Sequence, residues 1–231
     1  MHSQQFQIII PARKGSKRFP GKNKTILEGK PLIQHSIDFA IREGVTPSQI
    51  WVNSDDEEIL ALADKSGVNS YIRSQHLADD FASTVAVLED QIAFFRLNQI
   101  PCDAVILLQV TNPLRPSGLL KNSVKLFEES QRSSLCTFSR LNKKFGAIND
   151  NFFLPRNYLP GQRMQDLEPL YFENGLIYIT LAELIMNHQR IIGEDVYPLV
   201  MDHIFAQVDI DEPEDLLFAK FLLENTPNDK L

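Results

Sequence analysis

Short apolar segments alternate with segments of helical periodicity along most of this 231-residue chain. Continuous apolar runs, such as residues 104–108, are typical of strands that are buried on both faces of a parallel sheet covered by helices. The predicted strands cover residues 6–10, 50–52, 70–72, 104–108, 176–179 and 205–208, and the predicted helices cover residues 31–42, 57–63, 84–97, 119–127 and 214–224.

This order of elements predicts an α/β fold with a mostly parallel sheet. The pattern breaks at residues 142–169, where prolines and glycines stand among Phe152, Phe153 and Tyr158. We predict that this segment is an arm inserted into the fold rather than another strand–helix unit. No internal repeat or long linker is present, so we expect a single domain over residues 1–231.

Composition excludes several classes of protein. The net charge of −7 argues against a nucleic-acid-binding protein that relies on a broad basic face. Two cysteines without ligand spacing argue against a disulfide framework or a structural zinc site. No stretch reaches the length of about 20 apolar residues that a membrane span needs, and the start lacks a signal-peptide pattern. We therefore expect a soluble, cytoplasmic protein.

A basic loop, residues 11–24, follows the first predicted strand. It contains six lysines and arginines and no acidic residue, in a chain that is otherwise acidic. Gly15 and Gly21 allow the backbone to approach a ligand closely, and ligands of open α/β sheets bind at the carboxyl ends of the strands. The loop matches neither a P-loop nor a GxGxxG pattern, so we interpret it as a phosphate site of another kind. The alternative is an ordinary solvated loop.

The loop sequence IPARKGSKRFPGKN (residues 10–23), continued by residues 29–33, resembles the start of the acylneuraminate cytidylyltransferases, also called CMP-sialic acid synthetases. The resemblance implies a Rossmann-like nucleotidyltransferase fold. It also implies that Arg13, Lys22 and Asn23 contact the phosphates of CTP, and that Ser16 and Lys17 line the same loop.

Two further segments resemble the nucleotide-binding motifs of this family. Residues 73–84 resemble R-P-x-x-L-A-x-D-x-A-S, which implies that Arg73, Ser83 and Thr84 lie near the cytidine. Residue 83 alone also fits a helix N-cap. Residues 107–115, LLQVTNPLR, resemble L-L-Q-P-T-S-P-L-R, which implies that Gln109 recognises cytosine and also contacts the sugar.

Some residues near these motifs allow structural interpretations instead. Val110 and Asn112 replace the usual proline and serine of the second motif. Arg115 is interpreted as a structural ion-pair residue. Asp56 lies at the end of the second predicted strand, where the family has a similar S-T-D segment, and it equally fits a helix N-cap.

The sugar side is indicated by residues 161–167, which resemble Q-R-R-Q-D-L, and by residues 171–179, which resemble Y-x-x-N-G-A-I-Y-I. The resemblance implies a sugar-acid site in which a bidentate cation such as Arg163 suits the carboxylate. The expected sugar-binding residues are Gln109, Arg163, Gln165, Asn174 and Gly175. The pair at 174–175 also fits a simple turn. The arm lysine of the family aligns with Gly146, and Lys144 is only its neighbour.

Residues 208–216 resemble the end motif D-I-D-T-x-x-D-L of the family. Residues two apart in a strand point the same way, so Asp209 and Asp211 are expected to bind Mg²⁺, or alternatively Mn²⁺, together with the phosphates of CTP. Alternatively, Asp211 begins the last helix through a capping box with Glu214. The expected catalytic residues are Arg13, Lys22, Asp209 and Asp211.

The implied activity joins CTP to the anomeric hydroxyl of a nine-carbon 2-keto sugar acid and releases pyrophosphate. Family membership also implies a homodimer in which the arm of each chain completes the sugar pocket of the other. The alternatives are a 3-deoxy-octulosonate cytidylyltransferase and an inactive protein that only binds CTP. A general base cannot be assigned from the sequence.

Overall fold

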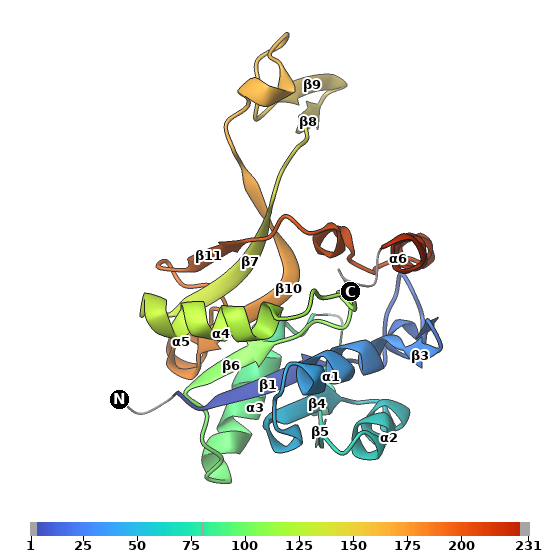
Figure 1. The fold of residues 1–231 in the computed structure, drawn as a ribbon, viewed down its shortest axis with the longest axis vertical. Coiled ribbons are helices and arrows are strands. Elements are labelled where there is room, and N and C mark those ends of the chain that lie inside the picture. Colours follow the sequence, from blue (N-terminus) through green and yellow to red (C-terminus); the bar gives the residue numbers. More distant parts are fainter. Residues whose placement is uncertain (1–3, 80, 227–231) are drawn as a thin grey trace.

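The structure, a computed structural model, describes residues 4–79 and 81–226. Both ends of the predicted domain and Asp80 of the 73–84 segment lie outside these residues. The main sheet has seven strands in the order β11-β7-β10-β6-β1-β4-β5, which Figure 1 shows at the centre of the molecule. The strands are β1 Phe6–Pro11, β2 Ile26–Leu27, β3 Lys30–Pro31, β4 Ile50–Ser54, β5 Asn69–Ile72, β6 Ala104–Leu107, β7 Ser134–Arg140, β8 Gly146–Asn149, β9 Phe152–Pro155, β10 Tyr171–Leu181 and β11 Tyr197–Val200.

Helices cover both faces of this sheet, as the apolar runs predicted. The α-helices are α1 Leu32–Arg42, α2 Glu57–Lys65, α3 Thr84–Leu97, α4 Leu119–Ser130, α5 Ala182–His188 and α6 Pro213–Asn225, and the short 3₁₀ helices are η1 Lys22–Lys24, η2 Pro47–Gln49, η3 Gln75–Leu77, η4 Met164–Asp166 and η5 Ile204–Gln207. Ile8 and Ile10 pack with α1, α2 and α4, whereas Ile9 packs with α3 and α5 on the other face. None of the described helices is long and apolar enough to cross a membrane.

The parallel part of the sheet positions the site. Strand β1 pairs in parallel with β4 and β6, and β4 pairs in parallel with β5, so their carboxyl ends share one edge. Strand β10 runs antiparallel to both β6 and β7. The mostly parallel α/β fold is therefore confirmed.

Some predicted elements were wrong or missing. The predicted strand 205–208 is instead the 3₁₀ helix η5, whose first turn is capped by the ring nitrogen of His203. Its apolar residues are too few to distinguish a strand from a buried turn. Strand β7 was missed because Ser134, Thr137 and Ser139 interrupt its apolar pattern, although all three are buried. Strand β11 and helix α5 were also missed.

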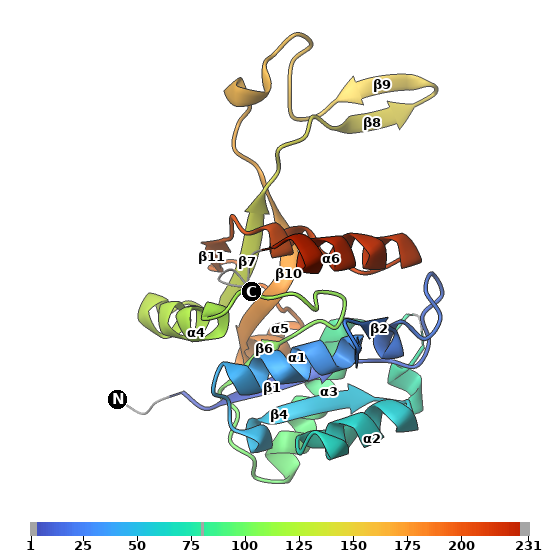
Figure 2. The ribbon, with the colours of Figure 1, turned by 45° about the vertical axis from the view of Figure 1, so that its right-hand side comes forward.

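The segment 142–169 lies between β7 and β10, which run past the body of the sheet and carry it outward (Figure 2). It contains the hairpin β8–β9 and the 3₁₀ helix η4. Its apolar side chains face solvent to an unusual degree: Ile148 is 75% exposed and Phe152 is 72% exposed. A protein normally buries such side chains, so this hairpin presents a surface suited to a partner.

Candidate active site

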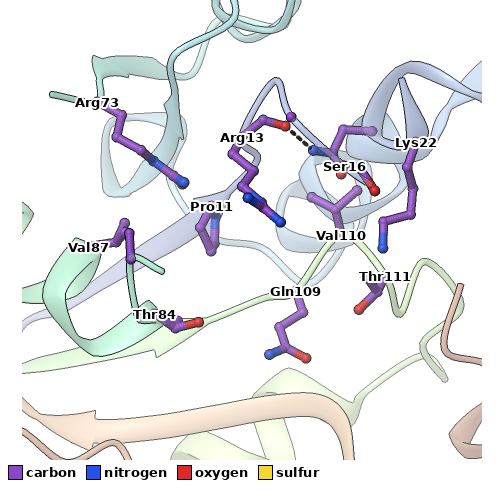
Figure 3. Close-up of a pocket in the computed structure, with 13 residues that line it drawn as sticks. Pro11, Arg13, Ser16, Lys22, Arg73, Thr84, Val87, Gln109, Val110 and Thr111 are labelled. Atoms are coloured by element: carbon purple, nitrogen blue, oxygen red, sulfur yellow. Dashed lines mark hydrogen bonds between the residues drawn. The ribbon is translucent and has the colours of Figure 1, made fainter. Parts of the chain in front are cut away.

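A pocket of about 240 Å³ lies at the shared edge of β1 and β6, beside the start of α3 (Figure 3). Its lining residues are Pro11, Arg13, Gly15, Ser16, Lys22, Asn23, Arg73, Ala82, Thr84, Val87, Gln109, Val110 and Thr111. Seven of the nine predicted nucleotide-binding residues are among them. The structure thus brings together three motifs that are spread over residues 10–115 of the chain.

The basic loop is anchored to the ends of neighbouring strands. The hydroxyl of Ser54 donates to the carbonyl of Ala12 at 2.5 Å, and the backbone N–H of Lys14 donates to Asp55 at 2.8 Å. The side-chain amide of Asn23 donates to the carbonyl of Arg13 at 2.8 Å and closes the loop on itself. Asn23 therefore shapes the loop in addition to lining the pocket.

Three cations reach the pocket, Arg13 and Lys22 from the basic loop and Arg73 from the loop after β5, as Figure 3 shows. Arg73 is only 6% exposed, and Asn53 accepts from it through both the side-chain oxygen, at 2.7 Å, and the backbone oxygen, at 3.0 Å. Burial lowers the pKa of Arg73 to about 10, so its guanidinium stays charged at neutral pH. A charge held in a dry site attracts phosphate more strongly than one in water.

The other two predicted nucleotide-binding residues do not line the pocket. The hydroxyl of Ser83 accepts from the backbone N–H of Ala86 at 3.1 Å, so Ser83 is the N-cap of α3. Lys17 is an exposed residue of the basic loop. Asp56 is the N-cap of α2, and it also forms a salt bridge with Lys24 at 3.0 Å.

Gln109 lies in the pocket on a loop that a buried arginine holds in place. Arg115 donates to the carbonyls of Gln109, at 2.8 Å, and Leu176, at 2.7 Å, and to the hydroxyl of Ser36. Its predicted structural role is confirmed, but the predicted ion pair is wrong, because none of the described contacts is with a carboxylate. Burial without an acidic partner lowers the pKa of Arg115 to about 9.

Gly175, one of the expected sugar residues, lies next to Gln109. A Cβ atom on Gly175 would be 3.0 Å from the side-chain oxygen of Gln109, so the backbone of Gly175 borders this side chain. The amide of Asn174 is used within the sheet: it donates to Ser139 at 3.0 Å and accepts from the N–H of Leu176 at 3.2 Å. Asn174 therefore shapes the backbone turn at Gly175.

Arg163 and Gln165 lie on the arm and do not line the pocket of their own chain. Arg163 forms two hydrogen bonds with Asp166, at 2.7 and 3.0 Å, and both side chains remain largely exposed. The neighbouring Lys144 contacts the ring of Tyr158 and donates to the carbonyl of Gln162. At Gly146 any side chain is excluded, because a Cβ atom would lie 2.2 Å from the carbonyl oxygen of Leu154.

Asp209 and Asp211 lie on an extended segment, not on the predicted strand. Val208 and Ile210 are buried while Asp209 is exposed and Asp211 half-buried, so the two carboxylates still share one side of the chain. Lys22 forms a salt bridge with Asp211 at 2.8 Å, which places this side beside the pocket. Arg18 forms a second salt bridge with the same carboxylate.

The alternative role for Asp211 as a helix cap is wrong. Helix α6 begins after Glu212, and the carboxylate of Asp215 accepts from the N–H groups of Asp211 and Glu212 at 2.8 Å. The Asp211 carboxylate is therefore available for other interactions. Desolvation alone would raise the pKa of Asp211, but the cations of Lys22 and Arg18 outweigh it and lower the pKa.

Although the residue as a whole is exposed, nearby protein atoms partly desolvate the Asp209 carboxyl group and raise its pKa, and the charge of Asp211 adds to the shift. A hydrogen bond from Thr111 opposes this increase. No cluster of three or more potential ligands from histidine, cysteine, aspartate and glutamate occurs among the described residues. Two carboxylates suit Mg²⁺, because this ion commonly takes its other ligands from water and substrate phosphates.

Thr111 and Arg18 belong to the site but were not predicted. Thr111 lines the pocket and also bonds Asp209, so it links the two parts of the site. Thr111 follows Gln109 by two residues in the loop after β6, and this position could have indicated its role. Arg18 gave no separate signal, because all six cations of the basic loop look alike in the sequence.

Comparisons with known proteins agree with this geometry. The sequence model of the cytidylyltransferase family matches residues 7–225. The CMP-N,N'-diacetyllegionaminic acid synthase of Legionella pneumophila is 32% identical, covering 94% of this chain and 95% of that protein. The pseudaminic acid cytidylyltransferase of Campylobacter jejuni is 32% identical, covering 93% and 94%. An N-acylneuraminate cytidylyltransferase of Streptococcus agalactiae is 32% identical, covering 90% of this chain and 51% of that longer protein.

Solved structures confirm the fold. A CMP:2-keto-3-deoxy-manno-octonic acid synthetase complexed with CTP superposes with a TM-score of 0.69 at 18% identity, covering 97% of this chain and all of the other. A 4-diphosphocytidyl-2C-methyl-D-erythritol synthase gives a TM-score of 0.67 at 12% identity, covering 96% of this chain and all of the other. The resemblance to the acylneuraminate cytidylyltransferases is thus confirmed along nearly the whole chain, and this nucleotidyltransferase belongs to the cytidylyltransferase family.

Proposed function

We propose that this chain transfers CMP from CTP to the anomeric hydroxyl of a sialic-acid-like, nine-carbon 2-keto sugar acid. The observation that carries the proposal is the convergence of Arg13, Lys22, Arg73 and Gln109 on one pocket. Relatives named for legionaminic, pseudaminic and N-acylneuraminic acids support this substrate class.

In the proposed reaction, the anomeric oxygen attacks the α-phosphorus of CTP and the bond to the β-phosphate breaks. A new phosphoester bond forms, pyrophosphate leaves, and the hydroxyl loses its proton. Arg13 and Lys22 are positioned to balance the charge that develops on the leaving pyrophosphate. Gln109 carries both an amide donor and an acceptor, which suits the edge of cytosine. The protein contributes positioning and charge stabilisation rather than a covalent intermediate.

We also propose that Asp209 and Asp211 hold a Mg²⁺ ion, with Mn²⁺ as a substitute. A bound ion would neutralise phosphate charge during the reaction. Lys22 and Arg18 now neutralise Asp211, so CTP phosphates would have to draw these cations away before Asp211 could act as a ligand. Removal of divalent cations with a chelator should therefore stop pyrophosphate release, and added Mg²⁺ should restore it.

We further propose that the protein is a cytoplasmic homodimer, and the arm supports the dimer. Arg163 and Gln165 cannot serve the pocket of their own chain as they are placed, since they stand on the projecting arm (Figure 1). In a dimer they could complete the pocket of the partner, where Arg163 would exchange Asp166 for the substrate carboxylate.

The test is a pyrophosphate-release assay with CTP across N-acetylneuraminate, legionaminate, pseudaminate and 3-deoxy-octulosonate. We expect release with at least one nine-carbon acid and weaker release with the octulosonate. A clear preference for the octulosonate would instead favour that enzyme, whose solved relative shares the fold. Binding of CTP without release with any of the acids would favour an inactive nucleotide-binding protein.

A further inference from the structure

The buried side-chain amide of Asn112 joins the loop after β6 to the segment that contains Asp209 and Asp211. Asn112 is 1% exposed, and its side-chain nitrogen donates to the carbonyl of Val208 at 2.8 Å and to the carbonyl of Asn174 at 3.1 Å. Both partners are carbonyl oxygens, which only accept, so the amide nitrogen has to face them. Both of its N–H groups are therefore used.

The two carbonyls belong to separate parts of the site. Val208 immediately precedes Asp209, and Asn174 immediately precedes Gly175, whose backbone borders Gln109. On the other side of Asp209, the N–H of Ile210 donates to the carbonyl of Thr111 at 2.7 Å. The loop thus holds the backbone on both sides of Asp209, a position where no strand pairing is present.

The side-chain oxygen of Asn112 is also closely packed. A Cβ atom on Gly175 would lie 2.4 Å from its side-chain oxygen, so the glycine leaves the space that this oxygen fills. The hydroxyl of Thr111 lies 3.3 Å from the same oxygen and also bonds the carboxylate of Asp209. Asn112 therefore contacts the segment before Asp209, the turn at Gly175 and the loop that carries Gln109.

We propose that Asn112 is a positioning residue that fixes the Asp209 carboxylate relative to Gln109, and hence the proposed metal site relative to the cytosine site. The inference deepens the proposed function and rests on it. A serine, the residue that the family motif has at this position, carries a single O–H donor on a shorter side chain and cannot donate to both carbonyls. In this chain the Asn112 amide donates to both carbonyls, whereas a serine would leave one of them without this donor.

The test compares Asn112→Ala and Asn112→Ser with a matched control, Thr137→Val. Thr137 is fully buried, and its hydroxyl bonds both the carbonyl and the N–H of Ile177 in β10 rather than the loop after β6 or the segment around Asp209. Each variant is assayed for melting temperature, for the affinity of CTP without metal, for Mn²⁺ binding to the CTP complex by electron paramagnetic resonance, and for kcat and KM.

We expect Asn112→Ala to weaken Mn²⁺ binding and to lower kcat by about tenfold or more, because two buried carbonyls lose their donor and Asp209 is released. CTP affinity without metal should stay within about twofold of the wild type, since Gln109 keeps its bond to Arg115. For Asn112→Ser, we expect Mn²⁺ binding and kcat to lie between the values of the wild type and those of Asn112→Ala. Thr137→Val should lower the melting temperature but leave Mn²⁺ binding unchanged.

Equal losses of Mn²⁺ binding in Asn112→Ala and Thr137→Val would overturn the positioning role. Unchanged Mn²⁺ binding in Asn112→Ala would overturn it as well. The binding measurements do not depend on turnover. If the wild type binds Mn²⁺ with CTP but turns over no sugar acid, the proposed function fails while the role of Asn112 is still decided. If the wild-type CTP complex binds no Mn²⁺, the inference itself fails.

Discussion

The replacement Gly175→Ala tests how closely the two halves of the site are packed. Gly175 has a φ angle of +76°, a left-handed conformation that costs a residue with a side chain about 1–2 kcal/mol. The new methyl group would also lie 2.4 Å from the side-chain oxygen of Asn112 and 3.0 Å from that of Gln109. Asn112 would have to move, and its two carbonyl partners would lose their donor.

The expected loss of stability combines these effects. Two unpaired buried carbonyls cost about 1–3 kcal/mol each, so together with the backbone cost the replacement should destabilise the fold by roughly 3–8 kcal/mol. In a protein of this size, that corresponds to a fall in melting temperature of roughly 6–32 °C. Thermal unfolding measured by circular dichroism would report it.

The double variant Gly175→Ala with Asn112→Ser isolates the contact. Serine frees the space that the methyl group needs, so the double variant should be at least about 1 kcal/mol more stable than the sum of the single effects predicts. Strict additivity would refute the reasoning, because it would mean that Gly175 is required only for its backbone angle. The matched control is Gly161→Ala, since Gly161 has a similar φ of +88° with no atom within 4 Å of the added methyl group.

Three further outcomes are expected. Asp209→Asn should nearly abolish Mg²⁺-dependent pyrophosphate release without lowering the melting temperature. The exposed control Asp202→Asn should change neither quantity. Full activity of Asp209→Asn would remove this carboxylate from the mechanism. Asn53→Ala should raise KM for CTP by about tenfold, because Arg73 loses a buried 2.7 Å hydrogen bond, and an unchanged KM would show that Arg73 is held without it. Ile148→Asp should convert a dimer into a monomer in light scattering, and a dimer that persists would exclude this face of the arm as the interface.

The sequence predicted the parallel part of the fold better than its antiparallel part. Residues 6–10 and 104–108 form buried strands whose apolar runs leave little choice of conformation. Strand β7 is just as buried, but its serines and threonine are satisfied by contacts far along the chain, such as the bond from Thr137 to Ile177. Such polar core residues look like loop residues until the partner strand is known.

In the site, too, features set by local sequence were predictable, whereas features that depend on distant residues were not. Motif resemblance predicted the residues that reach the pocket, because their spacing after each strand is local information. The bonding partners of Asn53, Arg115 and Asn112 were not predictable, since they lie 20 to 96 residues away in the chain. Arg115 illustrates the difficulty: an arginine in a motif suggests an ion pair, yet here it bonds carbonyls and a hydroxyl.

The charge pattern around the basic loop explains how an acidic chain keeps a strongly basic loop folded. Asp211 accepts from Lys22 and Arg18, Asp55 holds the N–H of Lys14, and Lys24 is paired with Asp56 and Glu58. Without these acids the loop cations would repel one another across a small space. A triphosphate could replace Asp211 as the partner of Lys22 and Arg18, and the carboxylate set free would then face the metal that accompanies the nucleotide. Loading of the nucleotide and completion of the metal site are therefore expected to be a single, mutually dependent event, with CTP and Mn²⁺ each raising the affinity for the other.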